Sequence, residues 1–395
     1  MSDHAAAAFD GVATVPFSDA VRLPTGATVT HIEREAETLD RSARARRVGP
    51  GRLAVAAVLP PGFLRTQLPA YADAPDKPDL TPRGYAAVAA DDAGDLVVAA
   101  LLVDRDPTHD VDAYPRAEIG TKVNEALRSR PADRLVRQLA RCAREYACRA
   151  AANAFYRRWE CALPVAAPAN EHPPASIAPR LDGEAEPREP AAFHATAEEV
   201  ATLAIEHVTA GGTLLSFGRA CEGEPLLAGR VLEDAIRLIR AATRSGTIHL
   251  ETNGSSPAAL RRLATTGLDA VTIRLVSARA DTYETLHRPE GYRFNDVRAS
   301  VRVAAEQRLS TSLLIPVLPG IFDRNEEIEA LVSLAGDLAE GSAVLMRDLA
   351  ADPLRALAVV KRRDTNVGVA RAMERLREEL PHLRVGSFVR PLARI

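Results

Sequence analysis

The sequence predicts an α/β fold in which a parallel sheet follows a small β-containing subdomain. After residue 198, short apolar segments alternate with helical segments of about 10–15 residues, a pattern typical of strand–helix repeats. With Leu163–Ala166 as the first strand, at least six repeats are present. A (β/α) barrel, full or partial, and a doubly wound sheet both fit. No GxGxxG motif follows a strand, which disfavours the dinucleotide-binding form.

The N-terminal third lacks the alternating strand–helix pattern of the rest of the chain. Residues 1–50 show weak periodicity, and we expect a poorly ordered lead-in. Residues 51–130 are predicted to form a small α+β subdomain. Within it, two apolar runs in 84–103 flank Asp91-Asp92-Ala93-Gly94, which is a β-hairpin signal.

Residues 131–395 are predicted to form the strand–helix part. The segment 131–160 is predicted to be one long helix, because Leu135, Leu139 and Cys142 recur at spacings of three and four. Residues 167–197 are rich in Pro, Ala and Glu and are expected to be a loop. The strands expected after it are 212–218, 247–254, 270–277, 310–318, 343–349 and 383–389, and the helices are 197–208, 229–243, 257–265, 279–287, 294–307, 324–338 and 367–379.

Composition excludes several classes of function. The 395 residues carry 50 basic and 53 acidic side chains, a net charge of −3, so neither nucleic acid nor an anionic membrane is an implied partner. The chain has no apolar run of membrane-spanning length and no N-terminal basic region followed by an apolar core. We therefore expect a soluble, cytoplasmic protein.

Polar residues follow the predicted strands, at the end where barrels place their chemistry. Glu222-Gly223-Glu224-Pro225 combines a sharp turn with two carboxylates and suits an ammonium group, although such segments are more often plain turns with solvated acids. Thr252 and Asn253 offer hydrogen-bonding groups after the next strand.

Arg274 and Ser277 lie on opposite faces of the following strand by alternation. An inward-facing arginine would need a buried partner, whereas an outward-facing one could reach solvent. Both orientations stay open.

The four cysteines are Cys142, Cys148, Cys161 and Cys221, and no CxxC pair occurs, which excludes zinc-ribbon and thioredoxin-like motifs. Cys142 and Cys148 would be about 240° apart around a helix. Cys161 precedes the first strand, which leaves Cys221 alone at the strand ends. We therefore expect no thiolate cluster. A metal site on His172 with Glu171 has as little support as a thiolate cluster, because a histidine in a loop is usually just solvated.

The order of these features resembles a branch of the radical S-adenosylmethionine (radical SAM) superfamily. The resemblance rests on "FGRACEGEP", "ETNG", "GLDAVTIRLVSA", "YETLHRPEGYRFNDV", "LPGIFDRNEE" and "MRDLAADP", and covers roughly residues 130–392. It implies a partial (β/α)6 barrel with a [4Fe–4S] cluster on a CxxxCxxC motif after the first strand. SAM would bind the open iron and be cleaved to a 5′-deoxyadenosyl radical.

The same resemblance shows where this chain departs from the family. The three cysteine positions fall on Ala169, Pro173 and Ser176, none of which supplies a thiolate. On strand four, Arg274 stands where a small polar residue usually meets SAM. On strand five, Leu314 replaces a polar residue.

The element whose backbone meets the SAM amino group is largely kept. The residues that the resemblance assigns to SAM are Glu222, Gly223, Glu224, Pro225, Thr252, Asn253, Arg274 and Ser277.

The resulting hypothesis is a cluster-less homologue, either a pseudoenzyme or a SAM-binding protein without radical chemistry. SAM or a similar small molecule stays a candidate ligand, and a [4Fe–4S] cluster is not expected although it is typical of the superfamily. Two alternatives stay open. One is an active enzyme with an atypically ligated cluster, and the other is a non-catalytic interaction partner of an active relative, with residues 50–130 docking the partner.

Overall fold

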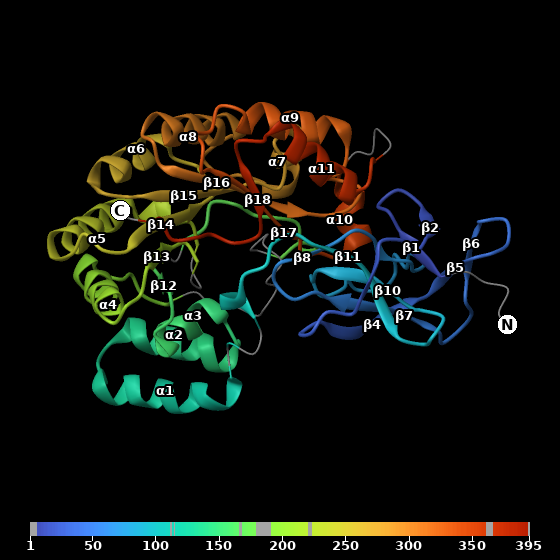
Figure 1. The fold of residues 1–395 in the computed structure, drawn as a ribbon, viewed down its shortest axis with the longest axis horizontal. Coiled ribbons are helices and arrows are strands. Elements are labelled where there is room, and N and C mark those ends of the chain that lie inside the picture. Colours follow the sequence, from blue (N-terminus) through green and yellow to red (C-terminus); the bar gives the residue numbers. More distant parts are fainter. Residues whose placement is uncertain are drawn as a thin grey trace.

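A seven-stranded parallel sheet forms the centre of the fold (Figure 1). The computed structural model describes residues 6–110, 113, 115–165, 168–178, 191–219, 223–360 and 366–393. The strands lie side by side in chain order: β12 (Glu160–Leu163), β13 (Leu214–Phe217), β14 (Thr247–Thr252), β15 (Ala270–Arg274), β16 (Ser310–Val317), β17 (Ala343–Asp348) and β18 (Arg384–Gly386). This order excludes a doubly wound sheet, in which the strand order reverses. No ladder joins β12 to β18 in the described residues, so the sheet is open.

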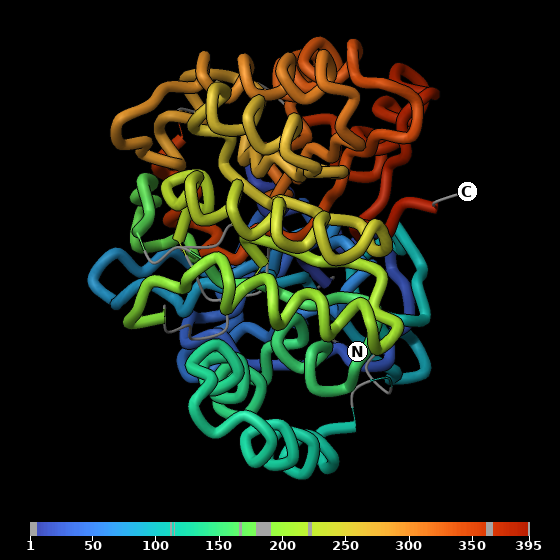
Figure 2. The backbone as a smooth tube through the Cα atoms, turned by 90° about the vertical axis from the view of Figure 1, so that its left-hand side faces the viewer, coloured from blue at the N-terminus to red at the C-terminus, as the bar shows by residue number. Residues whose placement is uncertain are grey.

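Helices cover one face of this sheet, as the alternating pattern predicts. They are α4 (Ala197–Thr209), α5 (Gly229–Ala242), α6 (Pro257–Thr266), α7 (Ala280–His287), α8 (Phe294–Glu306), α9 (Asn325–Ala335), α10 (Pro353–Val359) and α11 (Val369–Glu379). In Figure 2 the yellow-green helices α4 and α5 lie in front of the blue N-terminal segment, and the orange helices lie above it. The short 3₁₀ helix η3 (Pro225–Ala228) precedes α5. Helix α10 was not predicted.

The two faces of the sheet differ in polarity. Side chains such as Phe217, Leu250 and Ile273 are buried in the core beneath the helices. Their neighbours along the strands point to the opposite face and include Ser216 and His249, which are also buried. The polar face therefore belongs to the concave side of the sheet, away from the helices.

The segment 131–160, predicted to be one long helix, contains two helices instead. Helices α2 (Arg134–Glu145) and α3 (Arg149–Tyr156) are separated at Ala147, whose φ is 49°. Helix α1 (Arg116–Ser129) packs against both. Strand β12 begins at Glu160, so the first strand was placed three residues late, and Cys161 lies inside the strand rather than before it.

The N-terminal subdomain starts earlier than predicted. The expectation of a poorly ordered lead-in over 1–50 is wrong for the described residues, because β1–β6 lie there. The strands of the subdomain are β1 (Ala7–Phe9), β2 (Thr14–Pro16), β3 (Ala20–Arg22), β4 (Thr28–Glu35), β5 (Glu37–Leu39), β6 (Ala45–Arg47), β7 (Leu53–Val58), β8 (Phe63–Arg65), β9 (Leu68–Pro69), β10 (Tyr85–Ala90) and β11 (Leu96–Leu102). The 3₁₀ helix η1 (Pro107–His109) follows. The predicted hairpin is confirmed as antiparallel β10–β11, with Val88 opposite Val98.

The subdomain docks on the carboxyl ends of β16 and β17 (Figure 1). Arg65 is fully buried and donates to the carbonyl oxygens of Val317 (3.2 Å) and Leu349 (2.7 Å). The backbone N–H of Leu80 donates to the Asp352 carboxylate (2.8 Å). This docking covers part of the strand-end edge of the sheet. Among the described helices, none is long and apolar enough to span a membrane.

Candidate functional site

Most of the residues expected at the site meet at the carboxyl ends of β13, β14 and β15. Glu224 lies at the centre, with a side chain that is 1% exposed. Its carboxylate accepts hydrogen bonds from the Thr252 hydroxyl, from the Asn253 backbone N–H (2.8 Å) and from the Leu226 backbone N–H (3.0 Å). Pro225, which opens η3, is also buried. The turn after β13 is therefore held against the end of β14.

Arg274 faces inward, which settles the orientation that the sequence left open. It ends β15 and is 5% exposed. Its Nη2 lies 3.2 Å from Glu171 Oε1 and 3.7 Å from Glu224 Oε2. Glu171 comes from the loop after β12, the loop that the resemblance assigns to the cluster. One guanidinium thus lies between two buried carboxylates from different loops.

Two further side chains hold Glu171. His287 Nδ1 lies 2.9 Å from Glu171 Oε2, and His287 Nε2 accepts the backbone N–H of Val276 (3.3 Å). One ring nitrogen of His287 thus meets a backbone N–H and the other meets the Glu171 carboxylate. Asn253 Nδ2 donates to Asn170 Oδ1 (2.8 Å) and reaches Glu171 Oε2 at 3.5 Å. The loop after β12 is therefore bonded to the ends of β14 and α7.

The pKa values of the two carboxyl groups shift in opposite directions, although both groups are buried. Burial by itself raises the pKa of Glu171, but the Arg274 charge and the hydrogen bonds from His287 and Asn253 outweigh it and lower that pKa to about 2. For Glu224, burial prevails and raises the pKa, although Arg274, Thr252 and backbone N–H groups oppose it. Glu171 lies closer to Arg274 than Glu224 does and also has His287 beside it, and both favour its charged form.

The remaining predicted residues do not join this network. Ser277 donates to Glu327 and accepts the backbone N–H of Arg279 (2.9 Å). Gly223 is half-buried beside the network, whereas Glu222 lies outside the described residues. Ser277 therefore belongs to a separate cluster at the start of α9.

The loop positions that correspond to cluster cysteines offer no soft ligand. Ala169 is exposed and Pro173 is half-buried. Ser176 is buried, and its carbonyl oxygen accepts the backbone N–H of Asp352 (2.7 Å). In the part of the chain that the structure describes, no group of three His, Cys, Asp or Glu side chains could hold a metal ion. His172 pairs with Glu290 (2.7 Å) and is exposed.

The cysteines of the described residues lie elsewhere. Cys142 is buried in α2, and Cys148 precedes α3. Burial raises the pKa of the Cys161 thiol to about 12. Cys221 lies outside the described residues.

A second buried polar cluster lies on the concave face of the sheet. His249 Nε2 lies 2.8 Å from the Thr272 hydroxyl, and its Nδ1 lies 3.3 Å from the Ser216 hydroxyl. Burial lowers the pKa of His249 to about 3, so the ring is neutral. Nearby, Arg219 pairs with Glu251 (3.2 Å), which lies two positions after His249 on β14. These polar groups hydrogen-bond one another across the central strands.

Sequence reasoning missed the roles of Glu171 and His287 in this network. Glu171 lies within the loop between Ala169 and Pro173, and the sequence offers it only as a weakly supported metal ligand. Its partner Arg274 is 103 residues away. The one available signal was the strand arginine itself, because an inward-facing arginine requires a buried acid.

By sequence, no known family and no curated protein matches this chain. Among solved structures, it is similar to a radical SAM methyltransferase from Sphaerobacter thermophilus (TM-score 0.34, 16% identity, 51% of this chain and 59% of that one). It is similar to SuiB from Streptococcus suis bound to S-adenosylmethionine (TM-score 0.42, 12% identity, 70% and 62%). A third is methylornithine synthase, PylB (TM-score 0.40, 14% identity, 69% and 75%). With TM-scores this low, no functional conclusion rests on these similarities.

Proposed function

We propose that this chain is a radical SAM-type protein that has lost its iron–sulfur cluster and carries out no radical chemistry. In this proposal the open parallel sheet is the partial (β/α)6 barrel of the superfamily. The proposal is carried by one observation: the loop after β12 offers no thiolate at Ala169, Pro173 and Ser176 and instead inserts Glu171 against Arg274. The order of the sequence motifs gives further support.

The residues present do not fit a [4Fe–4S] cluster. A methyl group and a pyrrolidine ring cannot ligate iron, and a hydroxyl is a poor, hard substitute for a thiolate. Ser176 is moreover packed under the loop that precedes α10. We derive no reaction through a cluster at this place.

The residues also fit SAM poorly. SAM carries an ammonium, a sulfonium and a carboxylate, with a net charge of +1, and its positive groups would need the carboxylate and backbone groups around Glu224. Those groups are already bonded to Thr252, Asn253 and Leu226, and Arg274 supplies the positive charge. A second cation beside a buried guanidinium is repelled. We therefore propose a non-catalytic role in partnership with another protein.

Two measurements on protein isolated without oxygen test this function. After anaerobic reconstitution with iron and sulfide, we expect a colourless protein without the thiolate-to-iron charge-transfer band. Calorimetry with millimolar SAM should give no binding heat. A brown, iron-loaded protein would overturn the proposal in favour of an atypically ligated cluster. Binding heat from SAM without iron would instead support a SAM-dependent protein without radical chemistry.

A further inference from the structure

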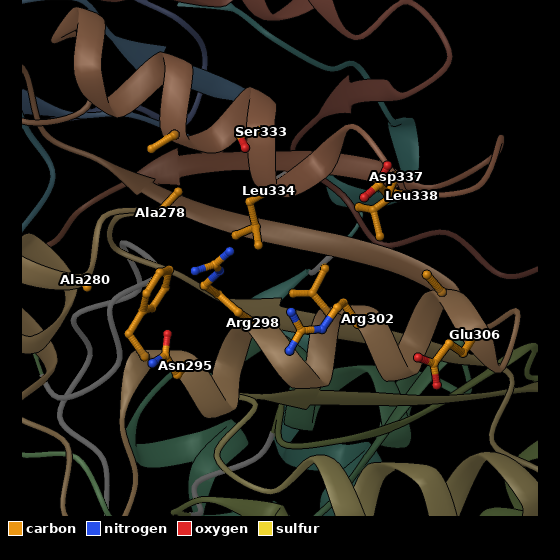
Figure 3. A pocket seen from close by; sticks show the side chains of 14 residues that line it. Ala278, Ala280, Asn295, Arg298, Arg302, Glu306, Ser333, Leu334, Asp337 and Leu338 are labelled. Carbon is orange, nitrogen blue, oxygen red and sulfur yellow. The ribbon is translucent and has the colours of Figure 1, made fainter.

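The helices that cover the sheet form a layer with a break in it. α4 packs on α5, α5 on α6 and α6 on α8, and farther along α9 packs on α11. Between α8 and α9 lies a groove of about 550 Å³ (Figure 3). It lies on the outer, helical side of the sheet.

The groove has the length and lining that suit another helix. Its α8 wall includes Phe294, Arg298, Val301, Arg302 and Ala305, positions that recur along one side of a helix and cover about 17 Å of its axis. The alanines at 278, 305 and 330 are small enough for a close backbone approach, and the buried Val301 makes part of the floor. An amphipathic helix binds such an apolar furrow by its own apolar stripe.

The groove carries positive charge that the protein itself does not neutralise. Arg298 and Arg302 are exposed and one helical turn apart, on the groove side of α8 (Figure 3). Neither has an acidic partner within the described ranges. By contrast, the nearby Arg261 pairs with Glu306 (2.6 Å), and Arg262 pairs with Glu233 (2.7 Å). Two neighbouring guanidinium groups are thus available for external carboxylates.

We propose that this groove binds an amphipathic helix of a partner protein that carries two carboxylates four residues apart. The carboxylates face Arg298 and Arg302, and apolar residues of the same helix fill the groove. Asp337 lies toward the Glu306 end of the groove (Figure 3) and favours a basic residue at that end of the partner. Because the groove is outside the strand-end network, its test is independent of the iron and SAM measurements.

The test uses the full-length protein and a synthetic peptide. A fluorescein-labelled helical peptide of about 16 residues, long enough for the groove at 1.5 Å per residue, carries an Ala/Leu stripe and two Glu residues four apart. By fluorescence anisotropy, we expect it to bind the wild type and to bind Arg298→Glu/Arg302→Glu at least tenfold more weakly. A peptide with Lys in place of both Glu should show the opposite preference.

Matched variants separate groove binding from general charge attraction. Arg371→Glu/Arg375→Glu reverses another pair one turn apart, on α11, and should leave peptide affinity unchanged. Ser333→Trp fills the groove from α9 at an exposed position and should abolish binding, with an unchanged circular dichroism spectrum. Equal binding to the wild type and both groove variants, or no peptide binding to any, overturns the proposal. Binding of inorganic phosphate at the two arginines without peptide binding also overturns it, in favour of a small-anion site.

Discussion

Arg274 is the residue on which the strand-end network depends. Its guanidinium lies 3.2 Å from Glu171 and 3.7 Å from Glu224, and all three side chains are buried. A buried ion pair need not stabilise a protein relative to apolar residues, but removing one partner leaves an uncompensated charge. The stability of the protein should therefore fall when one member of the network is replaced, and fall less when a charged pair is replaced together.

Arg274→Ala is expected to lower the free energy of unfolding by about 3–5 kcal/mol, because it leaves Glu171 and Glu224 without a counter-charge. Adding Glu171→Gln should recover part of this loss. Urea denaturation measures both. The control is Arg261→Ala, which breaks an exposed pair with Glu306 and should cost about 0–1 kcal/mol. Similar losses for Arg274→Ala and Arg261→Ala would contradict a network held by Arg274.

Asp323 should make stability depend on pH near neutrality. It is buried between β16 and α9, and burial raises its pKa to about 6 from 3.8. Since the folded-state pKa is the higher one, this stabilising contribution is full below about pH 4 and is lost as the pH rises through about 6. From about pH 5 to pH 7, wild type should lose about 1 kcal/mol relative to Asp323→Asn.

Paired urea titrations across this range measure the Asp323 effect. The other buried group with a pKa raised to about 6, Asp348, is present in both proteins and cancels. Glu171 has a lowered pKa, so its contribution is lost only as the pH falls below its unfolded value of 4.5 towards about 2. Parallel curves for wild type and Asp323→Asn would show that Asp323 does not titrate here.

At the scale of elements, the chain breaks between α2 and α3 because of the backbone conformation of one residue, which the apolar periodicity does not predict. Leu135, Leu139 and Cys142 repeat as in one continuous helix, yet Ala147 takes a left-handed conformation with φ of 49°. This conformation is unfavourable for alanine and acceptable for glycine. The chain changes direction at Ala147, and α3 then leads into β12.

Ala147→Gly is therefore expected to raise the free energy of unfolding by about 1 kcal/mol, because it relieves the left-handed strain. Thermal and urea unfolding both report this change. The control is Ala299→Gly in the middle of α8, which should lower stability by about 1 kcal/mol. A loss of stability at both positions would indicate that Ala147 is not strained.

The predictability of the elements follows from the range of the interactions that form them. Apart from α10, the helices and strands after residue 198 carry their own apolar period, so the sequence predicted them to within a few residues. Strands such as β1 and β2 have three residues each, too short for a period, and β1 also pairs with the distant β9. Within the site, Thr252 and Asn253 were found as strand-end polar residues, but Glu171 depends on a partner far along the chain.

At the scale of the whole molecule, Arg65 joins the N-terminal subdomain to the sheet. It is fully buried, donates to the carbonyl oxygens of Val317, Leu349 and Tyr85, and lies 3.8 Å from Asp348. If the Arg65 side chain were removed, these buried carbonyl oxygens would lose their hydrogen-bond donor. One side chain of β8 thus links the two parts of the fold.

Arg65→Ala is expected to destabilise the protein by about 3–5 kcal/mol and to expose the N-terminal subdomain to protease. Urea denaturation gives the energy, and limited proteolysis with mass spectrometry locates the first cuts, which we expect before residue 105. Arg22→Ala, in an exposed pair with Asp95 in the same subdomain, should change neither. An unaltered cleavage pattern in Arg65→Ala would show that other contacts hold the subdomain in place.

The bonding of Glu171 to Arg274 also affects how ligands for this protein should be sought. Any compound directed at the strand ends must first displace the loop. If displacement costs about 3 kcal/mol, about one molecule in 150 is receptive at a given moment, and the measured affinity weakens by the same factor. A compound library screened against the wild type would then yield few hits, whereas a form with the loop released could yield many.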